Sequence, residues 1–477
     1  MRRGSGWALV SVCAFACVAT DRSPPPAPPP NILLILADDL GWRDVAYAGS
    51  GFYETPRIDA LAAGALRFDA AYSNAPNCAP TRASLWTGRY APTTGCYTVG
   101  SATRDGPARV RRLDPPPNVT TIGPEWITSA ERLQEAGYRT GHVGKWHLGS
   151  AERGALPRDQ GFEFDVAGNQ RGHPPGYFAP YGQGARGLPG LERAPDGEYL
   201  TRRLTDEALR FLDQDDGRPW FLALSHYAVH SPIQAPSEVT ATFQGKAPRD
   251  GQHDETYAAM ISELDVSVGR LLDALDASGE AGETLVIFTS DNGGVGGYAA
   301  EGLQGGAETT SNAPLRGGKG MLTEGGIRVP LLIRPLGGAG QGARSVEPVI
   351  TVDLHATILA AAGLDHGPAT TDGRDLSPLL EDAGGTLDRT SLYWHFPAYL
   401  ECGREDWRTT PVSVIRHGRH KLLEFFEDDR LALYDLQDDP GEQRDISAKR
   451  PEVVKDLHRR LVAWRETMGA ALPTPAQ

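Results

Sequence analysis

The segment Asn31-Ile-Leu-Leu-Ile-Leu-Ala37 is a continuous apolar run that ends at the dipeptide Asp38-Asp39. Such a run is typical of a central strand in a parallel sheet, because helices cover both faces of that strand. A second run, Thr284-Leu-Val-Ile-Phe-Thr-Ser290, is followed by Asp291-Asn292. We therefore predict an α/β fold in which functional side chains gather at the carboxyl ends of the strands.

The two polar dipeptides also indicate a cation site. Neighbouring carboxylates at a strand end need a positive partner, although each dipeptide taken alone could simply cap a loop. The four side chains offer oxygen ligands and include no cysteine or histidine, which suits a hard divalent ion such as calcium better than zinc. The similar position of both dipeptides after a strand favours the cation site.

Helix-like and strand-like segments alternate along the rest of the chain. Helices are predicted at 129–137, 254–278 and 351–362, and strands at 138–144, 220–226 and 331–334. Beyond about residue 375, short strands at 391–396, 412–416, 420–426 and 431–436 precede an amphipathic helix. We therefore expect a main domain over 31–375 and a smaller C-terminal α+β subdomain over 376–477.

The composition limits the partners of this chain. Its 477 residues include 47 Lys and Arg against 61 Asp and Glu, for a net charge of -14. That balance argues against nucleic acid as a partner. An anionic substrate would therefore need positive charge concentrated locally.

The N-terminal residues favour export. Residues 1–20 combine two arginines with an apolar run of signal-peptide length, and the proline-rich residues 21–30 form an extended spacer. The string Ala14-Phe15-Ala16-Cys17 loosely matches a lipoprotein cleavage box, so a lipid anchor at Cys17 competes with ordinary cleavage near Ala19. We expect a periplasmic, outer-membrane-anchored or secreted protein.

The segment Cys78-Ala79-Pro80-Thr81-Arg82 is predicted to be a turn entering a helix. Unpaired N–H groups at a helix N-terminus favour negative charge on the cysteine or on a bound anion. Arg82 is one helical turn further on and would lie over the same place. A buried structural cysteine is the alternative interpretation.

The whole segment 78–89, CAPTRASLWTGR, resembles the signature of the type I sulfatases. In that family a maturation enzyme oxidises the cysteine to formylglycine, whose hydrate attacks sulfate esters. The resemblance covers nearly all of the chain from Asn31 onward and implies an alkaline-phosphatase-like fold. That fold has a large, mostly parallel sheet flanked by helices and a smaller C-terminal antiparallel sheet with a helix. The resemblance also implies one calcium ion, with the ligands Asp38, Asp39, Asp291, Asn292 and the modified Cys78.

Three further motifs resemble sulfatase signatures, although a single lysine or histidine is more often structural or solvated. They are Gly144-Lys-Trp-His-Leu-Gly149, Ser225-His-Tyr-Ala-Val-His-Ser-Pro232, and Gly318-Lys-Gly320 followed by Glu324-Gly-Gly-Ile-Arg-Val-Pro330. The resemblance implies that Lys145 and Lys319 hold the sulfate and that Arg82 stabilises the ionised nucleophile.

The resemblance gives the histidines separate roles. His147 takes the proton that releases sulfate from the covalent intermediate, and His230 contacts the sulfate and protonates the leaving alcohol. Imidazole suits this last role because its pKa lies near neutrality. His226 is expected to be supporting.

A sulfated carbohydrate is the expected substrate, of galactose or N-acetylgalactosamine type, although simple aryl sulfates are an alternative. Candidate sugar contacts are Asn169, Arg171 and His173, and His395 is a candidate for the substrate entrance. A phosphate or phosphonate ester hydrolase of the same fold, or a non-catalytic binder of sulfated glycans, stays possible. A disulfide between Cys96 and Cys402 is a further hypothesis.

Overall fold

A computed structural model describes residues 28–104, 110–182, 184, 187–338 and 342–476, with the isolated residues 1, 4, 6 and 8. The predicted signal peptide and spacer fall almost entirely outside these residues, and so does the possible lipid anchor at Cys17. Within the described part of the chain, none of the helices combines the length and apolarity needed to cross a bilayer.

The main sheet has eight strands in the order β10-β2-β9-β8-β1-β7-β5-β6. Their bounds are β1 (Asn31–Ala37), β2 (Leu66–Phe68), β5 (Arg139–Gly144), β6 (Phe164–Val166), β7 (Trp220–Ser225), β8 (Thr284–Ser290), β9 (Leu331–Arg334) and β10 (Arg344–Ser345). Strand β9 pairs antiparallel with β8 and β2, whereas the other neighbouring pairs are parallel. The predicted mixed, mostly parallel sheet is confirmed.

The central strand β1 shows why its sequence is apolar without alternation. Leu33, Ile35 and Ala37 belong to one hydrophobic cluster, whereas Ile32 and Leu34 belong to a second cluster. Because successive side chains of a strand point to opposite faces, both faces of β1 are buried.

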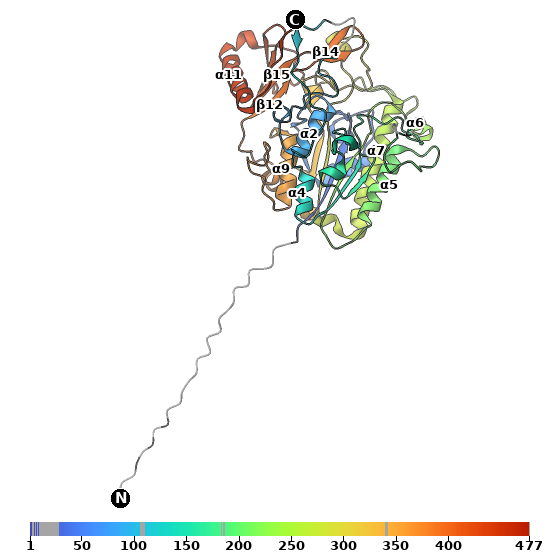
Figure 1. The fold of residues 1–477 in the computed structure, drawn as a ribbon, viewed down its shortest axis with the longest axis vertical. Coiled ribbons are helices and arrows are strands. Elements are labelled where there is room, and N and C mark those ends of the chain that lie inside the picture. Colours follow the sequence, from blue (N-terminus) through green and yellow to red (C-terminus); the bar gives the residue numbers. More distant parts are fainter. Residues whose placement is uncertain are drawn as a thin grey trace.

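Helices cover both faces of this sheet (Figure 1). The first face carries α1 (Pro56–Gly64), α5 (Leu200–Leu212), α6 (Ser237–Phe243) and α7 (Glu255–Ser278). The second face carries α2 (Cys78–Thr87), α4 (Ser129–Glu135), α9 (Thr351–Ala361) and α10 (Ser377–Glu381). The predicted helices at 129–137, 254–278 and 351–362 therefore correspond to α4, α7 and α9.

A smaller antiparallel sheet follows the main one, in the order β12-β15-β16-β17. These strands are β12 (Ser391–Phe396), β15 (Val412–His417), β16 (His420–Phe425) and β17 (Arg430–Asp435). Leu457 and Leu461 of α11 (Pro451–Met468) pack on the face formed by Ile415, Leu422 and Leu433. The C-terminal sheet and helix are confirmed, and the boundary at 375 stays a prediction.

Shorter elements complete the fold. The remaining strands and helices are β3 (Ala71–Tyr72), β4 (Leu113–Asp114), β11 (Val349–Ile350), β13 (Leu400–Cys402), β14 (Asp406–Thr409), β18 (Thr474–Pro475), α3 (Ala91–Thr94) and α8 (Glu324–Ile327). Short 3₁₀ turns lie at Ala46–Ala48, Ala151–Arg153, Pro157–Gln160, Glu280–Glu283, Ala299–Glu301, Leu336–Gly338 and Ser447–Lys449.

The proposed disulfide between Cys96 and Cys402 is wrong, because both thiols are free. Cys96 packs in the hydrophobic cluster that contains α2 and α4, whereas Cys402 packs with Tyr298 and Met321. The two cysteines therefore lie in separate parts of the core.

Candidate active site

Four adjacent strands of the main sheet deliver polar side chains to one edge. Asp38 follows β1, Lys145 follows β5, His226 follows β7 and Asp291 follows β8. These strands are neighbours in the order β8-β1-β7-β5, and all four run parallel. Their carboxyl ends therefore bring residues from distant parts of the sequence together, as expected for this class of sheet.

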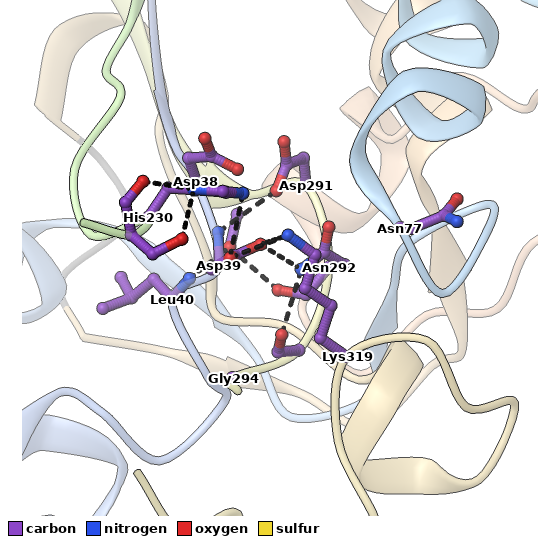
Figure 2. Close-up of polar contacts among 12 residues, drawn as sticks. Asp38, Asp39, Leu40, Asn77, His230, Asp291, Asn292, Gly294 and Lys319 are labelled. Carbon is purple, nitrogen blue, oxygen red and sulfur yellow. Dashed lines mark hydrogen bonds and ion pairs between the residues drawn. The ribbon is translucent and has the colours of Figure 1, made fainter. Parts of the chain in front are cut away.

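Each carboxylate of this edge has a cationic neighbour. Lys145 Nζ lies 2.7 Å from Asp38 Oδ2, and Lys319 Nζ lies 2.7 Å from Asp39 Oδ1. Asp39, Asp291, Asn292 and Lys319 converge on one small region (Figure 2). Burial alone would raise the pKa of Asp39, but Lys319 and His230 hold that pKa well below its usual range.

Two buried oxygen atoms in the same cluster have no hydrogen-bond partner among the described residues. They are Asp38 Oδ1 and Asn292 Oδ1. Burial raises the pKa of Asp38 well above its usual range, and Lys145 offsets this only in part because Asp291 and Asp39 add negative charge. Unpaired buried oxygens are what a bound cation would satisfy.

The geometry of the ligand atoms agrees with a metal site. Asp38, Cys78 and Asp291 each offer one atom, and these atoms lie within 4.8 Å of one another. Asp38, Asp39 and His230 form a second such group. The structure therefore contains an acidic cluster that fits a metal ion, and the first residue of α2 adjoins it.

Cys78 is itself buried, with 2% of its surface exposed. Burial raises the pKa of its thiol, although Lys145 and Lys319 oppose that shift. The two lysines therefore offset the effect of burial on this thiol only in part.

Contacts to the residues that follow two strands hold the Arg82 side chain in place. Its Nε donates to Asp291 Oδ2 over 2.8 Å, and its Nη1 donates to the carbonyl oxygen of Lys145 over 2.7 Å. The side chain is fully buried. Arg82 thus ties α2 to β8 and β5.

The two catalytic candidates among the histidines are electrically neutral here. Burial, Lys145, Arg82 and Lys319 lower the pKa of His147 well below its ordinary value, and its Nδ1 has no partner in the described structure. Burial and Lys319 lower the pKa of His230 to about 3, although Asp39 opposes the shift from 3.7 Å away. An anion bound beside Lys145 and Lys319 would raise both pKa values and so favour protonation of either histidine.

Two of the predicted sugar contacts touch these histidines. His173 stacks on His230, with ring centroids 6.1 Å apart and ring planes 14° from parallel. The carbonyl oxygen of Asn169 accepts a hydrogen bond from the His147 N–H over 2.8 Å. Asn169 therefore shapes the backbone around His147, whereas His173 is exposed beside His230.

Arg171 lies between them and is half-buried. Its N–H donates to Asn169 Oδ1 over 2.8 Å. At the next position, a Cβ on Gly172 would come within 2.4 Å of the His147 ring. A side chain at position 172 would therefore displace His147, so glycine is required by this close approach.

Residues 30–364 match the family model described as Sulfatase, and residues 318–467 match the model described as N-sulphoglucosamine sulphohydrolase, C-terminal. This chain belongs to the sulfatase family. A sulfatase of Formosa agariphila is 31% identical over 91% of this chain and 88% of its own. The mouse N-acetylgalactosamine-6-sulfatase is 32% identical over 94% of this chain and 88% of its own.

The fold agrees with a solved structure. The crystal structure of Ps i-CgsB in complex with k-i-k-neocarrahexaose has a TM-score of 0.73 at 29% identity, over 91% of this chain and 92% of that chain. This chain is therefore a sulfatase with the alkaline-phosphatase-like fold expected from its sequence.

One predicted site residue of this sulfatase is misplaced. His395 is buried, and its ring nitrogens contact Ser413 Oγ at 2.7 Å and the Ala471 carbonyl at 2.9 Å. It cannot line the substrate entrance, because both nitrogens serve the C-terminal packing. His226 is also buried and contacts Ser267 Oγ through Nε2 at 2.9 Å, and its supporting role stays a prediction.

Several residues that hold the sulfatase loops in place carry no signal in the sequence. Tyr177 Oη donates to the His230 carbonyl over 2.8 Å, and Tyr298 Oη donates to the Lys319 carbonyl over 2.8 Å. The fully buried Lys421 lies 2.9 Å from Glu324 and 2.9 Å from Glu442. No local pattern marks these side chains, because their partners are far away in sequence.

Proposed function

We propose that this sulfatase hydrolyses sulfate esters of saccharides, using formylglycine made from Cys78 and one calcium ion. The observation that carries the proposal is the meeting of position 78 with Asp38 and Asp291, whose ligand atoms lie within 4.8 Å of one another. Burial of Cys78 raises the pKa of its thiol, which supports a role for this residue as a precursor and not as a thiolate nucleophile. Formylglycine would supply an oxygen nucleophile at a place where the thiol is unreactive.

Asp38, Asp39, Asp291 and Asn292 would hold the calcium. Their oxygen-only donor set suits this ion, and the orphaned Oδ1 atoms of Asp38 and Asn292 are ready acceptors for it. Bound calcium would supply positive charge beside position 78. Asp39 and Asn292 hydrogen-bond to each other at 2.8 Å, so both are already oriented.

Lys145, Lys319 and His230 would bind the sulfate group. Lys145 is fully buried at the base of the site, whereas the side chains of Lys319 and His230 are 13% and 15% exposed. Lys145 would contact the anion from the buried side, and Lys319 and His230 would contact it from the exposed side. Together they would stabilise the charge that spreads over the sulfate oxygens in the transition state.

The two histidines would then divide the proton transfers. A bound sulfate offsets the charge of Lys319, which raises the pKa of His230 and lets it donate a proton to the departing alcohol. The bound sulfate would also offset Lys145 and Lys319 beside His147, whose Nδ1 has no partner among the described residues, so His147 would accept the proton that accompanies release of sulfate.

The loop beside His230 and the names of similar proteins both support a saccharide substrate. His173 is exposed there, and Asn169 and Arg171 belong to the same loop. One similar protein is named for an N-acetylgalactosamine sulfate, and a similar structure contains k-i-k-neocarrahexaose. The apolar N-terminal segment further supports export, with Cys17 as a possible lipid anchor.

The mass of the tryptic peptide 68–82 tests the nucleophile directly. Protein made with a formylglycine-generating enzyme should show the thiol converted to an aldehyde. An intact cysteine despite competent maturation would refute the proposed nucleophile. Rates on matched aryl sulfate and aryl phosphate then separate a sulfatase from a phosphate or phosphonate hydrolase, and cleavage of aryl sulfates alone would refute the saccharide substrate.

A further inference from the structure

Two chain segments run side by side away from the reaction centre. At one end, His173 stacks on His230. At the other end, the Tyr177 N–H donates to Gln234 Oε1 over 2.9 Å. The segments 173–177 and 230–234 each contain five residues, so Gln234 lies at most about 14 Å from His230 along an extended chain.

The far ends of both segments open into a hollow of about 410 Å³. Phe178 lies on one side with 37% of its surface exposed, and its ring packs at a tilt on Tyr199 with centroids 5.3 Å apart. Gln234, Ser237 and Gln244 are exposed on the other side. An exposed aromatic face surrounded by amides and a hydroxyl provides both kinds of contact that a sugar ring makes, since its C–H face is apolar and its hydroxyls form hydrogen bonds.

The charge of this hollow is the reverse of that at the reaction centre. Its lining includes the carboxylate of Glu255 and no lysine, arginine or histidine among the described residues. Glu255 Oε1 accepts a hydrogen bond from the Gly245 N–H over 2.9 Å, which holds the carboxylate in place. A sulfate group would be repelled there, whereas neutral hydroxyls would be accepted.

We propose that this hollow is a subsite for an unsulfated sugar unit of the saccharide whose sulfate is cleaved at Cys78. The inference rests on the proposed function and makes it more specific. The separation between His230 and Gln234 is at most about 14 Å, which a saccharide of a few units spans, so a longer substrate gains contacts in the hollow. The hollow therefore favours substrates with more sugar units. The Glu255 carboxylate disfavours a second sulfate group on the sugar unit that lies in the hollow.

The matured enzyme tests the subsite with three probes. These are para-nitrophenyl sulfate, a tetrasaccharide of κ-carrageenan, and a tetrasaccharide of chondroitin sulfate whose uronate carboxyls have been reduced to alcohols, so that its unsulfated units are neutral. In Phe178→Ala, we expect KM for the tetrasaccharide that the enzyme cleaves to rise about tenfold, because one aromatic contact is lost. KM for para-nitrophenyl sulfate should not change. Phe178→Tyr keeps the aromatic face and should restore the wild-type KM, and Leu336→Ala removes another exposed apolar side chain as a control.

Each other outcome overturns the inference in a distinguishable way. Equal losses on tetrasaccharide and aryl sulfate would mean that Phe178 acts through the fold, and unchanged KM on both would mean that the hollow is not used. If the wild type cleaves only para-nitrophenyl sulfate, the saccharide substrate and the subsite fail together. If it cleaves none of the probes, the proposed function fails and the subsite falls with it.

The Glu255→Gln variant tests the role of the negative charge, because glutamine retains the oxygen that accepts the hydrogen bond from Gly245. The substitution should lower KM for a tetrasaccharide of ι-carrageenan, which carries additional sulfates, and leave KM for the κ-carrageenan tetrasaccharide unchanged. An equal effect on both tetrasaccharides would refute the exclusion of sulfate by Glu255.

Discussion

Arg82 Nε donates a hydrogen bond to Asp291 Oδ2 over 2.8 Å, and both side chains are fully buried. The pair joins the helix that begins at Cys78 to the strand end that supplies the acidic cluster. The pair therefore fixes the position of the proposed nucleophile relative to the proposed metal site.

Replacing Arg82 with methionine should destabilise the protein by about 3–5 kcal/mol, since Asp291 would remain buried without its partner. The free energy of unfolding, measured by denaturant titration, checks this. Arg218 pairs with Glu163 at 3.0 Å on the surface, so Arg218→Met should cost less than about 1 kcal/mol. Equal costs for the two variants would contradict the role assigned to burial.

Cys78→Ala should abolish sulfate-ester hydrolysis, with a fall in kcat of at least about a thousandfold, because alanine cannot be converted to formylglycine. Cys96→Ala is the matched control, since Cys96 is also buried and free but packs among apolar side chains. The comparison uses matured protein and a common aryl sulfate. Retained activity in Cys78→Ala would remove this residue from the mechanism.

Calcium should stabilise the folded protein. A ligand that binds only the native state at about a hundred times its Kd adds about 2.7 kcal/mol, so Tm should rise when calcium is restored to chelated protein. Asp38→Asn should lose this rise, because one ligand carboxylate is gone, whereas the exposed Asp273→Asn should keep it. A calcium-dependent Tm that survives in Asp38→Asn would argue against the site.

Three buried histidines should make the protein sensitive to acid. Burial lowers the pKa of His226 to about 3 and the pKa values of His355 and His395 to about 4. In the unfolded chain each takes up a proton near its usual pKa of about 6.5. Stability from these groups is therefore complete above about pH 6.5 and is lost as the pH falls, by up to about 1.4 kcal/mol per pH unit for each histidine.

Unfolding free energies at a series of pH values check this expectation. His395→Gln should reduce the dependence between pH 6.5 and 4, whereas the same change at the exposed His253 should leave it intact. If His395→Gln keeps the full dependence, neutral burial of His395 is not its cause.

Parts of the candidate site were predictable because they are encoded locally. The apolar runs before Asp38 and Asp291 specify buried strands, and a polar residue directly after such a strand emerges at the sheet edge. The helix at Cys78 follows from the turn before it. The arrangement of these residues agrees with the sequence prediction, and their chemical roles await the experiments above.

The prediction failed where long-range packing decides the environment of a side chain. His395 lies in a strand that a sequence can identify, yet its ring contacts Ser413 and Ala471, and the second contact comes from 76 residues further on. Cys96 and Cys402 offered a chemically possible pair, but they pack in different clusters.

The sequence by itself determined the central strands, several of the helices and the polar residues at the strand ends, because hydrophobic periodicity and turn chemistry act over a few residues. Only the tertiary structure decided which of those polar residues meet. Lys319 reaches Asp39 across 280 positions, and Arg82 reaches Asp291 across 209. The order of strands in the sheet sets these meetings, and with them the burial and the neighbouring charges that determine each pKa.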